Sequence, residues 1–154
     1  MLKLIRNVAV AALLLPAAFF GQAKDPIIGN WVLNFGKSDF KQLAAPQTTT
    51  LTFTAIANGF IEHYKILNAN GATDNWEFKC AYDGMECSMP PESPLNAVTL
   101  KKIDANTVER SGIARKKVVE TVIYKISNGG KTLTVTTTGK DDNAGDSVQV
   151  YDKQ

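Results

Sequence analysis

The chain has 154 residues, with 17 Lys or Arg, 15 Asp or Glu and a single His. This near balance of charge does not supply the basic face that nucleic acid or an anionic membrane surface requires, so we expect no nucleic-acid partner. One His excludes metal sites built from several imidazoles, and the length fits one ordinary domain.

The first 23 residues have the composition of a secretory signal peptide. Lys3 and Arg6 form a positive start, 8–20 is apolar, and 21–23 supplies small residues for cleavage. The apolar stretch is short for a membrane span and is interrupted by a proline. We therefore expect a domain at 24–154, exported to the periplasm or outside the cell, with no stable membrane insertion after cleavage. An uncleaved membrane anchor is the alternative.

After this segment, stretches rich in Thr, Val, Ile, Phe and Tyr alternate with turn signals about every dozen residues. Several of these signals are Asn-Gly or Asp-Gly pairs, which suit two-residue hairpin loops. Successive hairpins predict an all-β, antiparallel up-and-down meander that closes into a barrel of about 8–10 strands, because closure removes exposed edges. The predicted strands are 27–33, 48–55, 60–67, 75–82, 97–103, 107–113, 118–126, 132–138 and 147–151, with a tenth at 85–88.

The two cysteines flank one of these turn signals. If Asp83 and Gly84 form a two-residue hairpin loop, Cys80 lies directly opposite Cys87. Opposed residues of an antiparallel pair have Cα atoms ~4.5–5.5 Å apart, which is within disulfide range. An oxidising compartment would let the bond form, so we expect a Cys80–Cys87 disulfide, with two free thiols as the alternative. We expect no metal site, because a C-x6-C pair alone is not a zinc signature.

Gly29-Asn30-Trp31, ahead of the meander, resembles the Gly-x-Trp signature of the lipocalin and calycin barrels. The stretches 29–34, 101–109 and 150–154 are similar to small exported bacterial lipocalin-like domains of unestablished function. The resemblance implies that Trp31 lies on the first strand and plugs the closed end of the barrel. In lipocalins an Arg near the last strand usually covers this Trp, and no Arg follows Arg115 in this chain.

The interior of the barrel is the candidate ligand site. Strand alternation places Glu62 inside and His63 outside. A buried carboxylate is costly unless it is paired, and Arg110 is a candidate partner across the lumen. Such a pair either anchors the polar head of a ligand or forms a structural bridge. The lumen candidates are Phe53, Glu62, Tyr64, Trp76, Phe78, Arg110 and Tyr124.

The sequence carries no recognisable catalytic constellation. Gly-x-Ser-x-Gly, His-Glu-x-x-His and Gly-rich phosphate-loop patterns are missing from it. We expect neither an enzyme nor a cofactor. A predominantly apolar lumen suits a small hydrophobic or amphipathic ligand. The alternative is a filled barrel that contacts another protein of the cell envelope through 37–46 and 90–94.

Overall fold

The computed structural model describes residues 24–41, 43–140 and 145–154. The expected signal peptide at 1–23 lies outside these residues. No helix in the described ranges is long and apolar enough to span a membrane.

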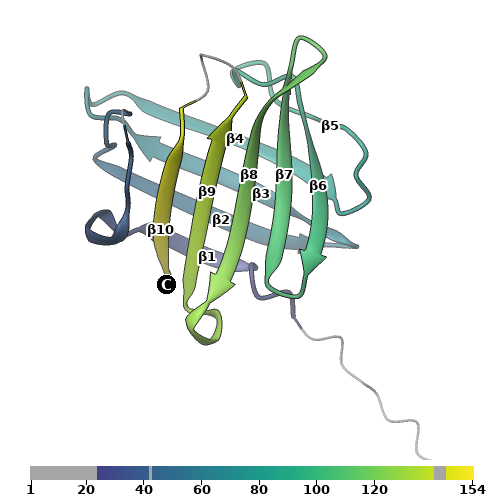
Figure 1. The fold of residues 1–154 in the computed structure, drawn as a ribbon, viewed down its shortest axis with the longest axis horizontal. Helices are drawn as coiled ribbons and strands as arrows, with labels where there is room; N and C mark the ends of the chain where they lie inside the picture. The colour runs from purple at the N-terminus through teal and green to yellow at the C-terminus, as the bar shows by residue number, and fades with distance from the viewer. Residues whose placement is uncertain (1–23, 42, 141–144) are drawn as a thin grey trace, which may run out of the picture.

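Within the described residues, ten antiparallel strands form one sheet that curls into a barrel (Figure 1). The sheet order is β4-β3-β2-β1-β10-β9-β8-β7-β6-β5, so each strand pairs with its chain neighbours except that β4 and β5 do not pair with each other, and β1 also pairs with β10. The predicted all-β meander is therefore confirmed. The elements are β1 (Gly29–Leu33), η1 (Phe35–Lys37), β2 (Thr48–Ile56), β3 (Gly59–Leu67), β4 (Thr73–Ala81), β5 (Cys87–Ser88), β6 (Ala97–Asp104), β7 (Thr107–Ala114), β8 (Lys117–Ser127), η2 (Asn128–Gly130), β9 (Thr132–Gly139) and β10 (Ser147–Lys153).

The turn between β2 and β3 shows how local sequence fixes the register. Ile56 pairs with Gly59, so the two loop residues are 57 and 58, one position earlier than the Asn58-Gly59 pair suggests. Asn58 takes a positive φ of 55°. Asn tolerates this left-handed conformation better than most residues. Gly59 is needed for a different reason: a Cβ there would lie 2.2 Å from the carbonyl oxygen of Cys80 on β4. The glycine therefore lets β3 and β4 approach closely.

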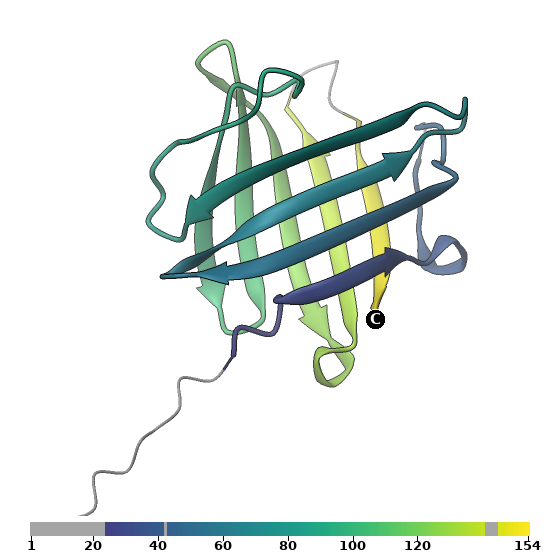
Figure 2. The same cartoon turned by 180° about the vertical axis from the view of Figure 1, so that it is seen from behind.

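The seam of the barrel lies between β4 and β5, the two edge strands of the sheet (Figure 2). The predicted Cys80–Cys87 disulfide is present, with the two Cα atoms 5.6 Å apart, and it links β4 to β5 across this seam. The predicted Asp83-Gly84 hairpin is wrong. The Gly84 N–H donates to the Leu100 carbonyl on β6, and β5 also pairs with β6, because the chain crosses to the far edge instead of folding back on β4.

Trp31 on β1 is fully buried. Its indole N–H donates to the carbonyl of Ile27 at 2.8 Å, so the polar group of the buried ring is satisfied. The ammonium of Lys153 on β10 lies 4.7 Å from the ring centroid. A cation from the last strand therefore covers this Trp, as the resemblance implies, but it is a Lys and not an Arg.

Aromatic side chains of β2, β3, β4 and β8 fill part of the barrel interior. Phe53 and Phe60 meet edge to face with centroids 4.9 Å apart, and Phe53 meets Tyr124 in the same way at 5.7 Å. Phe78 packs on the other side of Phe60. Edge-to-face pairs of this kind add to the free energy gained by burying the rings, so this part of the interior is a packed core.

Candidate functional site

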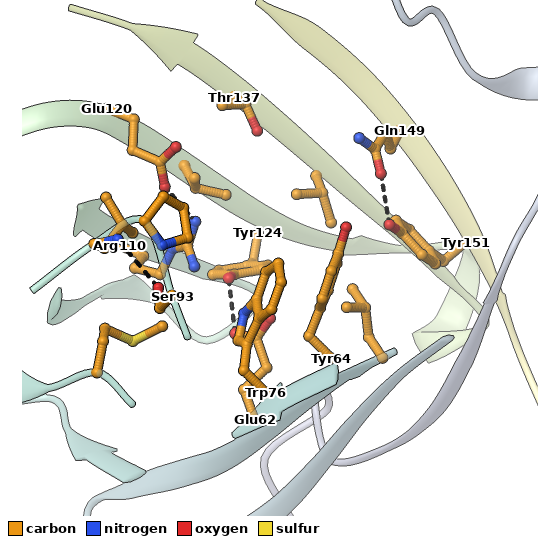
Figure 3. A pocket seen from close by; sticks show the side chains of 16 residues that line it. Glu62, Tyr64, Trp76, Ser93, Arg110, Glu120, Tyr124, Thr137, Gln149 and Tyr151 are labelled. Carbon is orange, nitrogen blue, oxygen red and sulfur yellow. Dashed lines mark hydrogen bonds and ion pairs between the residues drawn. The ribbon is translucent and has the colours of Figure 1, made fainter. Parts of the chain in front are cut away.

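A cavity of about 200 Å³ lies inside the barrel, and Trp31 is not among its lining residues (Figure 3). Side chains of β2, β3, β4, β7, β8, β9 and β10 form its walls. The loop between β5 and β6 contributes the remaining lining through Met89, Ser93, Pro94 and Leu95. The volume is below the ~300–1,000 Å³ typical of pockets for drug-sized ligands, so the cavity as it stands holds a small molecule or part of a longer one.

Five of the seven predicted lumen residues line this cavity: Glu62, Tyr64, Trp76, Arg110 and Tyr124. The other two, Phe53 and Phe78, face inward as predicted but belong to the packed core. Strand alternation identifies the inward face correctly. It does not show which inward side chains pack on one another: both rings pack on Phe60, whereas Glu62, their direct cross-strand partner, lines the cavity.

Glu62 is a carboxylate held almost completely inside the barrel, with 4% of its surface exposed. Its Oε2 accepts a hydrogen bond of 2.8 Å from the hydroxyl of Tyr124 on β8. Burial raises the pKa of the Glu62 carboxyl, and this effect outweighs the opposing influence of the Arg110 charge and of the Tyr124 hydrogen bond. Glu62 therefore holds its proton more strongly than an exposed Glu does.

Arg110 on β7 does not form the ion pair predicted with Glu62. Its guanidinium Nη2 donates to Glu120 Oε1 on β8 at 2.6 Å, and both side chains are largely buried. Gly112 allows this geometry, because a Cβ at that position would lie 2.5 Å from Cγ of Glu120. The prediction failed because Glu120 shares the inward face with Glu62 and lies on the strand directly beside Arg110.

Tyr64 and Trp76 form a stacked aromatic pair on the adjacent strands β3 and β4. Their ring centroids are 4.5 Å apart with an interplanar angle of 23°, and the two residues are paired in register. Burial raises the pKa of Tyr64 to about 12, so its hydroxyl stays protonated at physiological pH. The pair gives the cavity a flat apolar wall with a hydroxyl at its edge.

The lining is more polar than the sequence led us to expect. Glu120, Thr137, Gln149 and Tyr151 were not among the lumen candidates, yet all four line the cavity. The hydroxyl of Tyr151 donates to the Gln149 side-chain oxygen at 2.6 Å. A signal for Glu120 was present in the sequence, because it alternates with two inward residues of β8, Val122 and Tyr124.

The site is suited to binding by shape, hydrogen bonds and charge. Among the described residues, no three His, Cys, Asp or Glu side chains come together in a way that could hold a metal ion. His63, the one imidazole of the chain, is bonded to Asn75 of the neighbouring strand rather than to any cavity residue. The charged groups of the lining are therefore Glu62, Arg110 and Glu120.

Comparison with known proteins supports the architecture. No protein-family model matches the chain, and no curated protein sequence matches it either. Among solved structures, a fatty acid binding protein of Schistosoma mansoni in complex with arachidonic acid is 15% identical, with a TM-score of 0.60, covering 84% of this chain and 96% of that one. A zebrafish ileal bile acid-binding protein complexed with cholic acid is 12% identical, with a TM-score of 0.55, covering 84% and 99%. This chain has the same kind of barrel.

Proposed function

We propose that this protein is a non-catalytic binder or carrier of a small amphipathic ligand, which it holds inside the barrel. The observation that carries the proposal is the interior cavity of about 200 Å³, which combines an aromatic wall with a cluster of charged groups. The barrel shared with a fatty acid binding protein and a bile acid-binding protein supports it, and both of those proteins are named for binding and not for catalysis.

The two sides of the cavity suit the two parts of an amphipathic molecule. Its apolar part would lie against the Tyr64–Trp76 stack and against Leu51 and Val122, which also line the space. Burying apolar surface there supplies the main favourable free energy. Its polar head would lie at Glu62, where a few placed polar groups fix the orientation of a ligand.

The loop between β5 and β6 is the expected route of entry. It contributes four residues to the lining, and between Ser88 and Ala97 it belongs to no strand, with its backbone hydrogen bonds limited to a few near Met89, Ser93 and Asn96. Its first end is tied down by the Cys80–Cys87 disulfide. Loops with few backbone hydrogen bonds open at lower free-energy cost than strands, so opening here would admit a ligand without breaking the barrel.

We also propose that the protein works outside the cytoplasm, in the periplasm or beyond the cell. The composition of the first 23 residues supports this, because it matches a secretory signal peptide. The disulfide supports it as well, since such bonds persist mainly in oxidising compartments. N-terminal sequencing of protein recovered from the exporting cell tests the cleavage site directly, and a mature chain that retains the first 23 residues would contradict export by cleavage.

The function is tested by native mass spectrometry on protein purified gently from the exporting cell, followed by extraction of anything bound. We expect a discrete extra mass from a small amphipathic molecule. A clean mass of the free protein, together with no uptake of added amphiphiles, would contradict binding and would favour a barrel that acts through its outer surface on an envelope protein.

A further inference from the structure

We propose that the cavity selects a small amphiphile whose head group donates hydrogen bonds and carries no negative charge, an amine or an alcohol, and that it discriminates against carboxylates. This inference rests on the proposed function, because it names the class of ligand that the same cavity takes. It is carried by the balance of charges and of hydrogen-bonding groups around Glu62.

The first argument is the balance of charge. Among the described residues that line the cavity, two carboxylates, Glu62 and Glu120, stand against one guanidinium, Arg110. Arg110 is already bound to Glu120 at 2.6 Å. A ligand carboxylate would bring a third acidic group beside a single cation whose charge Glu120 already offsets, and burying uncompensated charge is costly. With Glu62 protonated the lining is neutral, and the ligand carboxylate would still have to share Arg110 with Glu120.

The second argument is the capacity for hydrogen bonds that remains. Glu62 accepts one hydrogen bond among the described residues, from Tyr124, while a carboxylate has room for several. The Tyr124 hydroxyl uses its only hydrogen in that bond. When Glu62 is ionised, its carboxylate offers only acceptors, and an ammonium group would satisfy them and neutralise the charge. When Glu62 is protonated, its hydroxyl donates as well, and an alcohol, which both donates and accepts, satisfies the position.

A buried donor elsewhere in the cluster does not change this balance. Nε of Arg110 lacks a hydrogen-bond partner among the described residues, but the atom is shielded from a water-sized probe. A ligand in the cavity therefore does not reach it. An anion would have to share the guanidinium with Glu120, whose negative charge already offsets the one positive charge of the lining.

This ligand class differs from the ligands of the structural neighbours. Those proteins are in complex with arachidonic acid and with cholic acid, and both of these are carboxylic acids. The barrel is shared, but the charges inside this one favour the opposite kind of head group. Fold likeness alone would predict the wrong ligand chemistry here.

The experiment compares 1-octanol, octylamine and octanoate, which share one alkyl chain and differ in the head group. Each is titrated by calorimetry into the mature, disulfide-intact protein at neutral pH, after any bound molecule has been removed. We expect the amine and the alcohol to bind about tenfold or more tightly than octanoate. Octanoate binding as tightly as the others would overturn the inference and leave the proposed function standing. Binding of none of the three would overturn both.

Two variants assign the selectivity to the residues. Glu62→Gln keeps an acceptor for Tyr124 but loses the charge, so the preference for octylamine over octanoate should fall about tenfold. Glu120→Gln frees Arg110, so octanoate should gain affinity by a similar factor. Glu77→Gln, an exposed position on β4, is the matched control and should leave all three affinities unchanged. An unchanged ratio in both cavity variants would overturn the inference.

Discussion

Two parts of the barrel interior are built from the same strands and yet differ in kind. Trp31, Phe53, Phe60 and Phe78 are buried in an apolar cluster and do not line the cavity. Around Glu62 and Arg110, the inward side chains are polar or charged and a cavity remains. On β8 the change takes place between Tyr124, which packs on Phe53, and Glu120, which holds Arg110.

This contrast shows what alternation in a strand determines and what it leaves open. The period of two decides which side chains face inward. The chemistry of successive inward positions decides whether they pack or surround a space, because charged groups keep hydrogen-bond partners or solvent and do not interlock as aromatic rings do. We infer that stability resides mainly in the packed core that contains Trp31 and ligand selection in the cavity beside Glu62.

The largest expected effect is on stability, at Trp31 in the packed core. Trp31→Ala should lower the free energy of unfolding by about 3–5 kcal/mol, because it removes a fully buried indole and leaves a cavity. Chemical denaturation followed by circular dichroism measures this. Trp76→Ala, at the half-buried cavity wall, is the matched control and should cost clearly less. Equal losses of unfolding free energy in the two Trp variants would contradict the division between packed core and cavity wall.

The second effect concerns the seam. Replacing Cys80 and Cys87 together by Ala should lower the free energy of unfolding by about 2 kcal/mol, because the disulfide closes a short loop that links β4 to β5. Denaturation of the variant, and of the native protein with and without reductant, measures it. The reductant should not change the stability of the double variant. A stable seam in reduced native protein would show that the contacts of β4 with β6 are sufficient.

The third effect is on binding at the cavity wall. Trp76→Ala should weaken the binding of octylamine about tenfold, because it removes half of the aromatic stack with Tyr64. Calorimetric titration measures the affinity. Phe35→Ala removes an exposed aromatic side chain outside the cavity and serves as the control. An affinity unchanged in the Trp76 variant would remove this residue from the site.

The smallest effect is on the pH dependence of stability. Because burial raises the pKa of Glu62 in the folded state above its ordinary value of 4.5, the native protein holds this proton more firmly than the unfolded chain. The stability that Glu62 contributes is then complete below about pH 4.5 and is lost as the pH rises through the folded pKa. Glu62→Gln lacks this loss.

Denaturation at a series of pH values measures the difference in unfolding free energy between Glu62→Gln and the native protein. We expect the free energy of unfolding of the variant to increase relative to that of the native protein as the pH rises above about 4.5. Arg110, Glu120 and Tyr124, the groups around Glu62, are present in both proteins, so their own contributions largely cancel. A difference that stays constant with pH would mean that the carboxyl is not shifted in this direction.

Local signals in the sequence were sufficient for the strands. Turn residues and alternation gave nine of them to within a few residues, because both signals act between chain neighbours. They were not sufficient at the seam. Asp83-Gly84 is a strong hairpin signal, yet the hydrogen bond from Gly84 to Leu100 on β6 takes the chain to the other edge of the sheet. Closing the barrel outweighs the local turn preference there.

The sequence predicted which side chains face the interior, but not how the charged side chains pair there. Alternation placed Glu62 and Arg110 inside together, and both line the cavity. Their partners depend on which strands are neighbours and on Gly112, whose missing side chain makes room for Glu120. Whether an inward ring such as Phe53 or Phe78 packs or lines a space depends on the side chains that reach it from strands across the barrel, which no single strand encodes.

The central claim is that the ligand lies inside the barrel beside Glu62. The most direct measurement is nuclear magnetic resonance of the mature protein with octylamine, recording nuclear Overhauser contacts between the alkyl chain and the protein. The account predicts contacts to the rings of Tyr64 and Trp76, with none to the exposed side chains of Phe35 and Leu43. Contacts confined to Phe35 and Leu43, with none to the stacked rings, would contradict it.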